Sequence, residues 1–166
     1  HTVSGRMCGR HHVSVQPRHL AAFLRHPARF PPVPAEVTTT IRAAETAYYQ
    51  GQPLWRRGLE DAQDMATFAF PRLTTALDFS VGPYRIKAST VEQTLLPFAL
   101  ENDYLTLVDV PATHALDAIA YFAEQPEFST WGAAVYLEYL RQDHPDLARM
   151  DWAAIAADHM LIAKLY

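Results

Sequence analysis

The chain has 166 residues, of which 49% are hydrophobic, and a formal net charge of −4. A chain of this length buries about 70% of its unfolded surface without covalent crosslinks, so we expect one domain, with or without an arm. The single cysteine, Cys8, cannot form an internal disulfide, and no apolar run approaches the roughly 20 residues that a membrane span requires. These features argue against a disulfide scaffold and a helical membrane protein, and the N-terminal residues lack the hydrophobic core of a signal peptide. We therefore expect a cytoplasmic protein, and the excess of arginine over lysine, with the many alanines, indicates a bacterial origin.

Charge is divided unevenly along the chain. Residues 1–35 contain five arginines, five histidines and no acidic residue, whereas residues 36–166 contain nine basic and eighteen acidic residues. The first part therefore carries a charge of +5 and the second a charge of −9. On this basis we predict a basic Arg/His-rich arm over residues 1–34 and a single helical α+β domain over residues 35–166.

Three short segments make up the predicted arm. Residues 1–16 show no helical stripe, although two alternating valines near their end would suit a short edge strand. Pro17 is well placed in the first turn of a short helix that ends before Pro27. The Pro-rich run 30–34 favours an extended polyproline segment, so we take it as the linker to the body.

Two helices are predicted next, over residues 35–49 and 54–70. The second is amphipathic, and we expect its apolar side chains to point inward and its charged side chains outward. The expected inward set is Trp55, Leu59, Ala62, Met65, Ala66 and Ala69, and the expected outward set is Arg56, Arg57, Glu60, Asp61 and Asp64.

The apolar pattern then changes from a helical to a strand period. Residues 77–81 and 84–88 alternate apolar and polar side chains, which predicts two half-buried strands with a turn at Gly82-Pro83. Residues 90–100 are ambiguous, because a proline interrupts any long helix there. Residues 104–110 form a continuous apolar run that suits a strand buried on both faces.

The C-terminal part predicts three helices, over about residues 113–125, 129–143 and 151–166. Pro126 is expected to end the first helix, and Asp151 to cap the third. The predicted fold class is therefore α+β and predominantly helical, with about six helices and a small antiparallel sheet of two or three strands.

Cys8, His11 and His12 are the first candidates for chemistry. A thiol near imidazoles can act as a thiolate nucleophile or ligate a metal, since both roles need a lowered thiol pKa. One cysteine and two adjacent histidines do not complete a four-coordinate zinc site, so a metal would need further ligands. The alternative interpretation is that these residues belong to an exposed, His-rich segment with no chemical role. Residues 1–7 are either native or the remnant of an expression tag.

The run Met7-Cys8-Gly9-Arg10 is similar to the start of SRAP-domain proteins, which cross-link to abasic DNA through a cysteine exposed by removal of the initiator methionine. The resemblance covers these four residues. Cys8 is not the first residue here, and the internal Asn-x-Arg, Glu and His elements of that family have no counterpart in order. We do not assign the chain to the family.

The basic arm is the predicted interaction surface. We expect a protein partner to bind Arg10, Arg18, Arg25, Arg29 and Phe30. Deletion of the arm should then abolish partner capture and leave the thermal melt of the body nearly unchanged. The same charge would neutralise phosphates, which makes salt-dependent nucleic-acid binding an alternative, although aromatic side chains for base stacking are scarce in the arm.

Histidine and aspartate side chains in the C-terminal part give a third set of candidates. His114 and Asp117 lie one helical turn apart, and His159 lies near the chain end, so a metal site within a helical bundle is conceivable. Helix capping and solvent exposure explain the same residues without a metal.

Several catalytic signatures are absent from the sequence: a Gly-rich phosphate loop, Gly-x-Ser-x-Gly, His-Glu-x-x-His and paired cysteines. Our hypothesis is a non-catalytic, partner-binding accessory, adaptor or regulatory protein that needs no cofactor. The first alternative is an enzyme that uses Cys8 or a His-bound metal, and the second is a nucleic-acid-binding protein that uses the basic arm.

Overall fold

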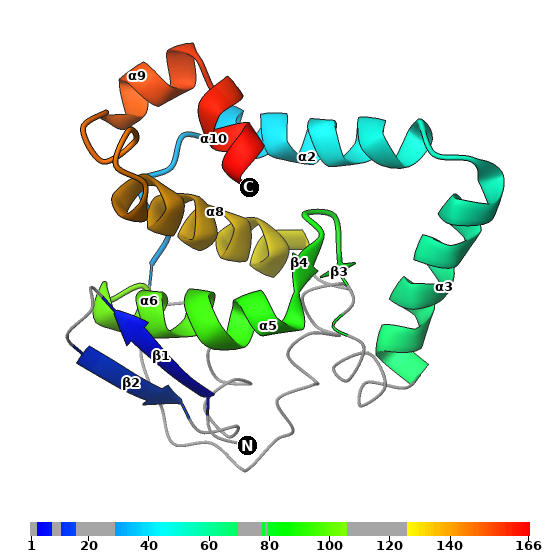
Figure 1. The fold of residues 1–166 in the computed structure, drawn as a ribbon, viewed down its shortest axis with the longest axis horizontal. Helices are drawn as coiled ribbons and strands as arrows, with labels where there is room; N and C mark the ends of the chain where they lie inside the picture. The colour runs from blue at the N-terminus through cyan, green and yellow to red at the C-terminus, as the bar shows by residue number, and fades with distance from the viewer. Residues whose placement is uncertain (1–2, 8–10, 16–28, 70–77, 79, 106–125) are drawn as a thin grey trace.

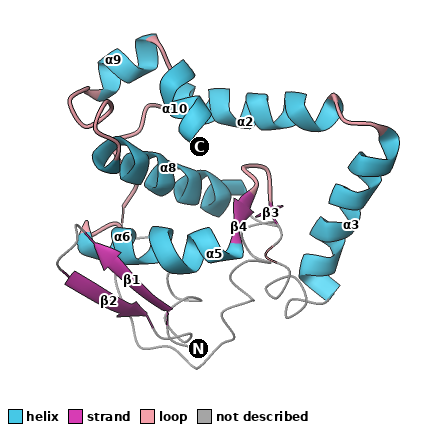
Figure 2. Ribbon diagram, in the orientation of Figure 1, coloured by secondary structure: helices cyan, strands magenta, loops and turns pink. Residues whose placement is uncertain are grey.

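The computed structural model describes residues 3–7, 11–15, 29–69, 78, 80–105 and 126–166, and within these ranges the chain is mostly helical (Figure 1, Figure 2). The helical elements in chain order are α2 (Ala35–Gln50), α3 (Leu54–Ala69), α5 (Ala88–Thr90), a π-helical turn η1 (Val91–Leu95), α6 (Leu96–Glu101), α8 (Pro126–Asp143), α9 (Trp152–Ala157) and α10 (Met160–Leu165). The strands are β1 (Val3–Met7), β2 (His11–Val15), β3 (Ser80–Val81) and β4 (Ile86–Lys87).

Helix α8 lies at the centre of the fold. It contacts α2 and α10 on one side and the η1–α6 segment on the other (Figure 1). The helix is buried on more than one side, because residues 131–135 are buried without a break and Trp131, Val135 and Leu137 are fully buried. They pack in one core with buried side chains from the surrounding helices, among them Val37, Ile41, Leu95, Leu96, Phe98, Ile155 and Ile162.

A buried carboxylate joins α8 to α9. Glu138 is 2% exposed, and its two oxygens accept hydrogen bonds from Arg141 Nη2 at 2.7 Å and Arg141 Nε at 3.0 Å. Gln142 Nε2 and the indole Nε1 of Trp152 donate to the same carboxylate at 2.9 and 2.7 Å. Burial disfavours the charged form of Glu138, but these hydrogen bonds and the Arg141 charge outweigh it and lower the pKa of the carboxyl.

The ambiguous stretch before residue 101 is helical. The segments α5, η1 and α6 follow one another without a break from Ala88 to Glu101. Pro97 lies in the first turn of α6, directly after the π-helical turn, where the wider hydrogen-bonding pattern accommodates its missing N–H. A proline therefore does not divide this run.

The C-terminal helices differ from the prediction at two points. Helix α8 begins at Pro126, three residues before the predicted start, as suits a residue whose fixed φ fits the first helical turn. Asp151 caps α9 as predicted, since its side chain accepts a hydrogen bond from Ala154 N at 2.8 Å. The single helix predicted for residues 151–166 is wrong, because Asp158 is extended (φ −144°, ψ 93°) and separates α9 from α10. The helix predicted over residues 113–125 lies outside the described residues.

The predicted sheet of two or three strands is not confirmed. In the described part of the chain, β3 and β4 pair antiparallel over two residues each, Ser80 with Lys87 and Val81 with Ile86. Of the third predicted strand, Tyr104 and Leu105 are described and buried, and its remainder lies outside the described residues. The hairpin is short because the chain leaves the strand conformation at both ends, into a turn and into α5.

The described parts of the predicted arm contact the body. Strands β1 and β2 pair antiparallel, with Val3 opposite Val15 and Met7 opposite His11, and this hairpin lies against α6 (Figure 1). Further along, the carbonyl oxygen of Arg29 accepts a hydrogen bond at 2.8 Å from the indole Nε1 of Trp131. A division of the chain at residue 34 stays a prediction, and these contacts cross it.

Candidate functional site

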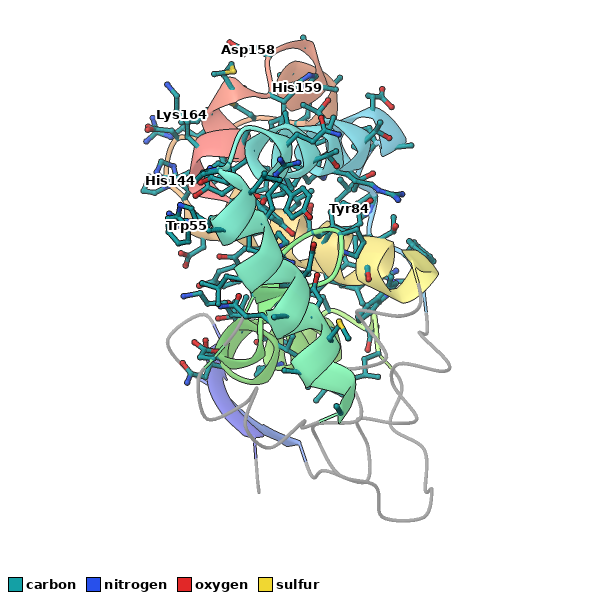
Figure 3. The ribbon with its side chains drawn as sticks, turned by 90° about the vertical axis from the view of Figure 1, so that its right-hand side faces the viewer. Trp55, Tyr84, His144, Asp158, His159 and Lys164 are labelled. Carbon is teal, nitrogen blue, oxygen red and sulfur yellow. The ribbon has the colours of Figure 1, made fainter. Side chains whose placement is uncertain are left out.

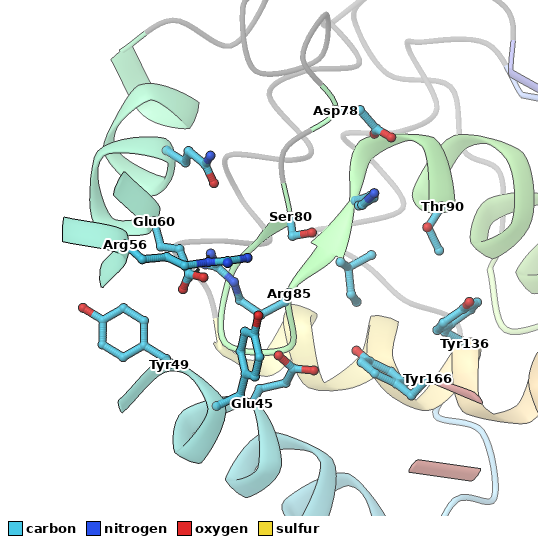
Figure 4. A pocket seen from close by; sticks show the side chains of 14 residues that line it. Glu45, Tyr49, Arg56, Glu60, Asp78, Ser80, Arg85, Thr90, Tyr136 and Tyr166 are labelled. Carbon is cyan, nitrogen blue, oxygen red and sulfur yellow. Dashed lines mark ion pairs between the residues drawn. The ribbon is translucent and has the colours of Figure 1, made fainter. Parts of the chain in front are cut away.

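A polar cavity of about 520 Å³ lies between α2, α3, the β3–β4 hairpin and the C-terminal end of the chain (Figure 4). Its volume falls in the range of small-molecule sites. Its walls carry acidic, basic and tyrosine side chains in similar numbers: Glu45, Glu60 and Asp78; Arg56, Arg85 and Lys87; and Tyr48, Tyr49, Tyr136 and Tyr166.

Arg85 links the hairpin to α3 across the cavity. It follows Gly82-Pro83 and adopts a positive φ of 51°, a conformation that non-glycine residues adopt at a cost. Its Nη1 donates to both oxygens of Asp64 at 3.0 Å, and its Nη2 lies 3.5 Å from a Glu60 oxygen. The guanidinium is therefore already neutralised by two carboxylates of α3.

The three acidic groups of the cavity differ in their partners. Glu60 pairs with Arg85, and Asp78 accepts hydrogen bonds from Ser89 N at 2.9 Å and Ser89 Oγ at 2.7 Å. Glu45 is half-buried and has no hydrogen bond or ion pair to any residue in the described part of the chain. Burial raises the pKa of the Glu45 carboxyl, Arg85 opposes that rise, and Glu60 adds to it.

Tyrosine rings form the wall beside Glu45. The rings of Tyr136 and Tyr166 meet edge to face, with centroids 5.5 Å apart, and the Tyr166 hydroxyl donates to the carbonyl oxygen of Tyr84 at 2.8 Å. Burial raises the pKa of Tyr136, and it raises that of Tyr166 well above the usual range, with the Glu45 charge adding to the effect. Both phenols are therefore neutral at neutral pH.

Helix α3 does not bury the apolar face that was predicted to point inward. Glu60 and Asp64, predicted to point outward, are partly buried and bind Arg85, whereas Arg56 and Asp61 are exposed as predicted. Four large apolar side chains of the helix face solvent. Leu54 is 78% exposed, Trp55 69%, Leu59 51% and Met65 73%. Figure 3 looks onto this helix, with Trp55 beside its upper end. The inward placement predicted for Trp55, Leu59, Ala62, Met65 and Ala69 is therefore wrong.

The reason for the reversal is the charge on Arg85. Its guanidinium needs carboxylate partners once the hairpin holds it in the cavity, and the acidic stripe of α3 supplies Glu60 and Asp64. A helix that turned its apolar side inward would remove both partners and leave the guanidinium unpaired. We call the outward apolar side, made by Leu54, Trp55, Gly58, Leu59, Ala62, Met65 and Ala69, the outer face of α3.

The residues predicted for the arm surface are only partly described. Arg29 is, and its Nη2 donates to the carbonyl oxygen of Asn102 at 2.8 Å while its guanidinium lies 4.9 Å from the ring centroid of Tyr104. Phe30 is exposed. The other three, Arg10, Arg18 and Arg25, lie outside the described residues.

The candidates for nucleophilic or metal chemistry are not brought together among the residues that the structure describes. His11 and His12 lie in β2, whereas Cys8, His114 and Asp117 fall outside the described ranges. His159 precedes α10, and its Nε2 lies 3.4 Å from Thr40 Oγ1. In the described ranges no three His, Cys, Asp or Glu side chains are grouped so that they could hold a metal ion.

No protein-family model, curated protein or solved structure matches the chain. None of the helices in the described ranges has the length and apolar character needed to cross a bilayer. The function must therefore follow from the geometry of the site.

Sequence reasoning missed the cavity because its residues come from five separated segments and form no motif. The acidic stripe of α3 was nevertheless visible in the sequence.

Proposed function

We propose that this protein is a non-catalytic binding protein and that the outer face of α3 is its protein-contact surface, with a second copy of the chain as the occupant. The observation that carries the proposal is the exposure of Leu54, Trp55, Leu59 and Met65 on one helix. Large apolar side chains gathered on one exposed face mark an interaction surface more often than single exposed ones. Each such side chain contributes roughly 1.5–3 kcal/mol when it is fully buried.

The spacing of the stripe suits a partner helix. Trp55, Leu59, Ala62 and Ala69 of the outer face are separated by steps of four, three and seven residues, which fits the heptad pattern of paired helices. Space for a partner is open at Gly58, because a Cβ atom built there meets no atom within 4 Å. Glycine and alanine on the stripe allow two helix backbones to approach closely.

The shape of the outer face favours a second copy over an unrelated helix. It carries the large side chains of Trp55 and Leu59 on the same stripe as Gly58 and Ala62. In an antiparallel pair of α3 helices, the large side chains of one copy can therefore meet the small residues of the other, and the two-fold axis repeats the contact. An accessory, adaptor or regulatory role for such a dimer remains the hypothesis drawn from the sequence.

The test is the molar mass of the purified chain, measured by sedimentation equilibrium over a wide range of protein concentration. We expect a monomer–dimer equilibrium for the wild type and a monomer for Leu59→Asp. The matched control is Ala43→Asp, which adds the same charge at an exposed position of α2. A wild type that stays monomeric, or a Leu59→Asp variant that still dimerises, overturns the proposal.

A further inference from the structure

Within the described residues, one acidic group of the cavity makes neither a hydrogen bond nor an ion pair, although the Arg85 charge acts on it from a distance. Glu60 and Asp78 are engaged by Arg85 and Ser89, whereas Glu45 is half-buried and unpaired in the described part of the chain. A carboxylate withdrawn from water without a hydrogen-bond donor is costly, and a bound cation would relieve that cost. Figure 4 shows the Glu45 side chain directed into the cavity, next to Tyr166.

The neighbouring side chains narrow the chemistry of the ligand. Tyr48, Tyr49, Tyr136 and Tyr166 all line the same cavity, and tyrosine rings attract cations through their electron-rich faces. Of these, Tyr166 lies beside Glu45 and meets Tyr136 edge to face, and a carboxylate next to tyrosine rings is a combination that recognises an organic ammonium ion. A small metal ion would instead need several oxygen ligands close together, and no such cluster is present in the described residues.

The basic side chains of the cavity do not favour an anion instead. Arg85 is held by Asp64 and Glu60, so its charge is compensated. Arg56 and Lys87 are exposed and come from different elements, α3 and β4. An anion would therefore contact one solvated cation at a time, whereas a cation meets the unpaired carboxylate and the tyrosine wall together.

We propose that the cavity between α2, α3 and the β3–β4 hairpin is a binding site for a small organic ammonium ion, with Glu45 as its counter-charge and tyrosine rings around its positive nitrogen. The cavity has room for a ligand of this class with a polar tail. This site lies on the inward side of α3, and it does not depend on whether the outer face of that helix pairs.

The probe is choline, and the matched control ligand is 3,3-dimethylbutan-1-ol, which has the same shape with a carbon atom in place of the charged nitrogen. Isothermal titration calorimetry of the full chain at neutral pH should show saturable binding of choline and none of the neutral analogue at the same concentrations. Equal binding of both compounds overturns the proposal, because it indicates an apolar site without recognition of charge. Binding of acetate, with none of choline, overturns it as well.

Two variants locate the contact within the cavity. Glu45→Gln keeps the shape of the side chain and should weaken choline binding by about tenfold or more, since the counter-charge of the ammonium ion is lost. Tyr48→Leu, at an exposed ring on the cavity wall, should weaken it by roughly two- to fivefold. Glu36→Gln removes the same charge from an exposed position of α2 outside the cavity and should leave affinity unchanged. If Glu45→Gln binds choline as tightly as Glu36→Gln does, the assignment of Glu45 is wrong.

Discussion

Helices α8 and α3 each carry a tryptophan in an amphipathic sequence, yet the structure treats the two helices in opposite ways. Trp131 of α8 is completely buried and donates its indole N–H to the carbonyl oxygen of Arg29, whereas Trp55 of α3 is 69% exposed. The carboxylates of the two helices, in contrast, behave alike: Glu138 of α8 pairs with Arg141 in the core, and Glu60 of α3 pairs with Arg85 at the cavity. An apolar stripe therefore identifies a contact face, and the charges on the opposite side decide whether that face points into the molecule or out of it.

The largest expected difference between the two helices is in the free energy of unfolding. Trp131→Ala should lower it by about 3–5 kcal/mol, because it opens a large cavity in the core and leaves the Arg29 carbonyl without its donor. Trp55→Ala should change it by no more than about 0.5 kcal/mol when measured at concentrations where the chain is monomeric. Urea unfolding of both variants checks the comparison. A large loss with Trp55→Ala would mean that α3 buries its apolar side in solution.

A second contrast separates the carboxylates of α8 and α2. Glu138→Gln should lower stability at neutral pH by about 1.5–3 kcal/mol, because the charge that binds Arg141 and Trp152 is lost from a buried position. Glu45→Gln should leave stability unchanged or raise it, since Glu45 has no partner to lose in the described part of the chain. Thermal melts of the two variants beside the wild type measure the difference. Equal destabilisation by both would contradict the isolation of Glu45.

The same pair predicts opposite responses to pH. The pKa of Glu138 is lowered below the ordinary value of 4.5, so its contribution to stability is present above that value and is lost as pH falls through the lowered pKa. The pKa of Glu45 is raised above 4.5 in the folded protein, so this carboxyl binds more protons in the folded state than in the unfolded state. Its ionisation therefore lowers stability as pH rises above 4.5, and the full loss is reached above the raised pKa. The loss of stability in Glu138→Gln should therefore become smaller as pH falls. Any increase of stability in Glu45→Gln should become larger as pH rises toward neutral. Melting temperatures measured across that range give both trends.

The smallest expected effect concerns the tyrosine wall. Tyr166→Phe removes one hydrogen bond, to the Tyr84 carbonyl, and should cost about 0.5–1.5 kcal/mol. Tyr48→Phe, at an exposed ring, serves as its control and should cost nothing measurable. If the two substitutions cost the same, the Tyr166 hydroxyl does not hold the C-terminal end of the chain to the hairpin.

Sequence periodicity was sufficient to predict which side chains are buried where no distant charge competes with the core for the orientation of the helix. The buried side of α8 and the Asp151 cap follow from local spacing and side-chain chemistry. The orientation of α3 did not follow, because it depends on Arg85, which lies more than twenty residues further along the chain. The break at Asp158 was missed for a similar reason, since helical periodicity resumes directly after it.

The candidate site was less predictable than the fold. Glu45 and Tyr166 approach one another only after α2, the hairpin and the C-terminal helices have packed, so no spacing in the sequence relates them. The sequence directed attention to histidines and to the basic arm, where residue type suggested chemistry. An unpaired carboxylate in a cavity has no local sequence signal, because being unpaired is a property of the packed structure.

The bond between Trp131 and the Arg29 carbonyl has a consequence for shortened versions of this protein. A fragment that starts at residue 35 would retain every helix from α2 onward but would lose the Arg29 carbonyl to which the Trp131 N–H donates. A fragment that starts a few residues before Arg29 would keep that acceptor. We therefore expect the longer fragment to have the higher melting temperature of the two.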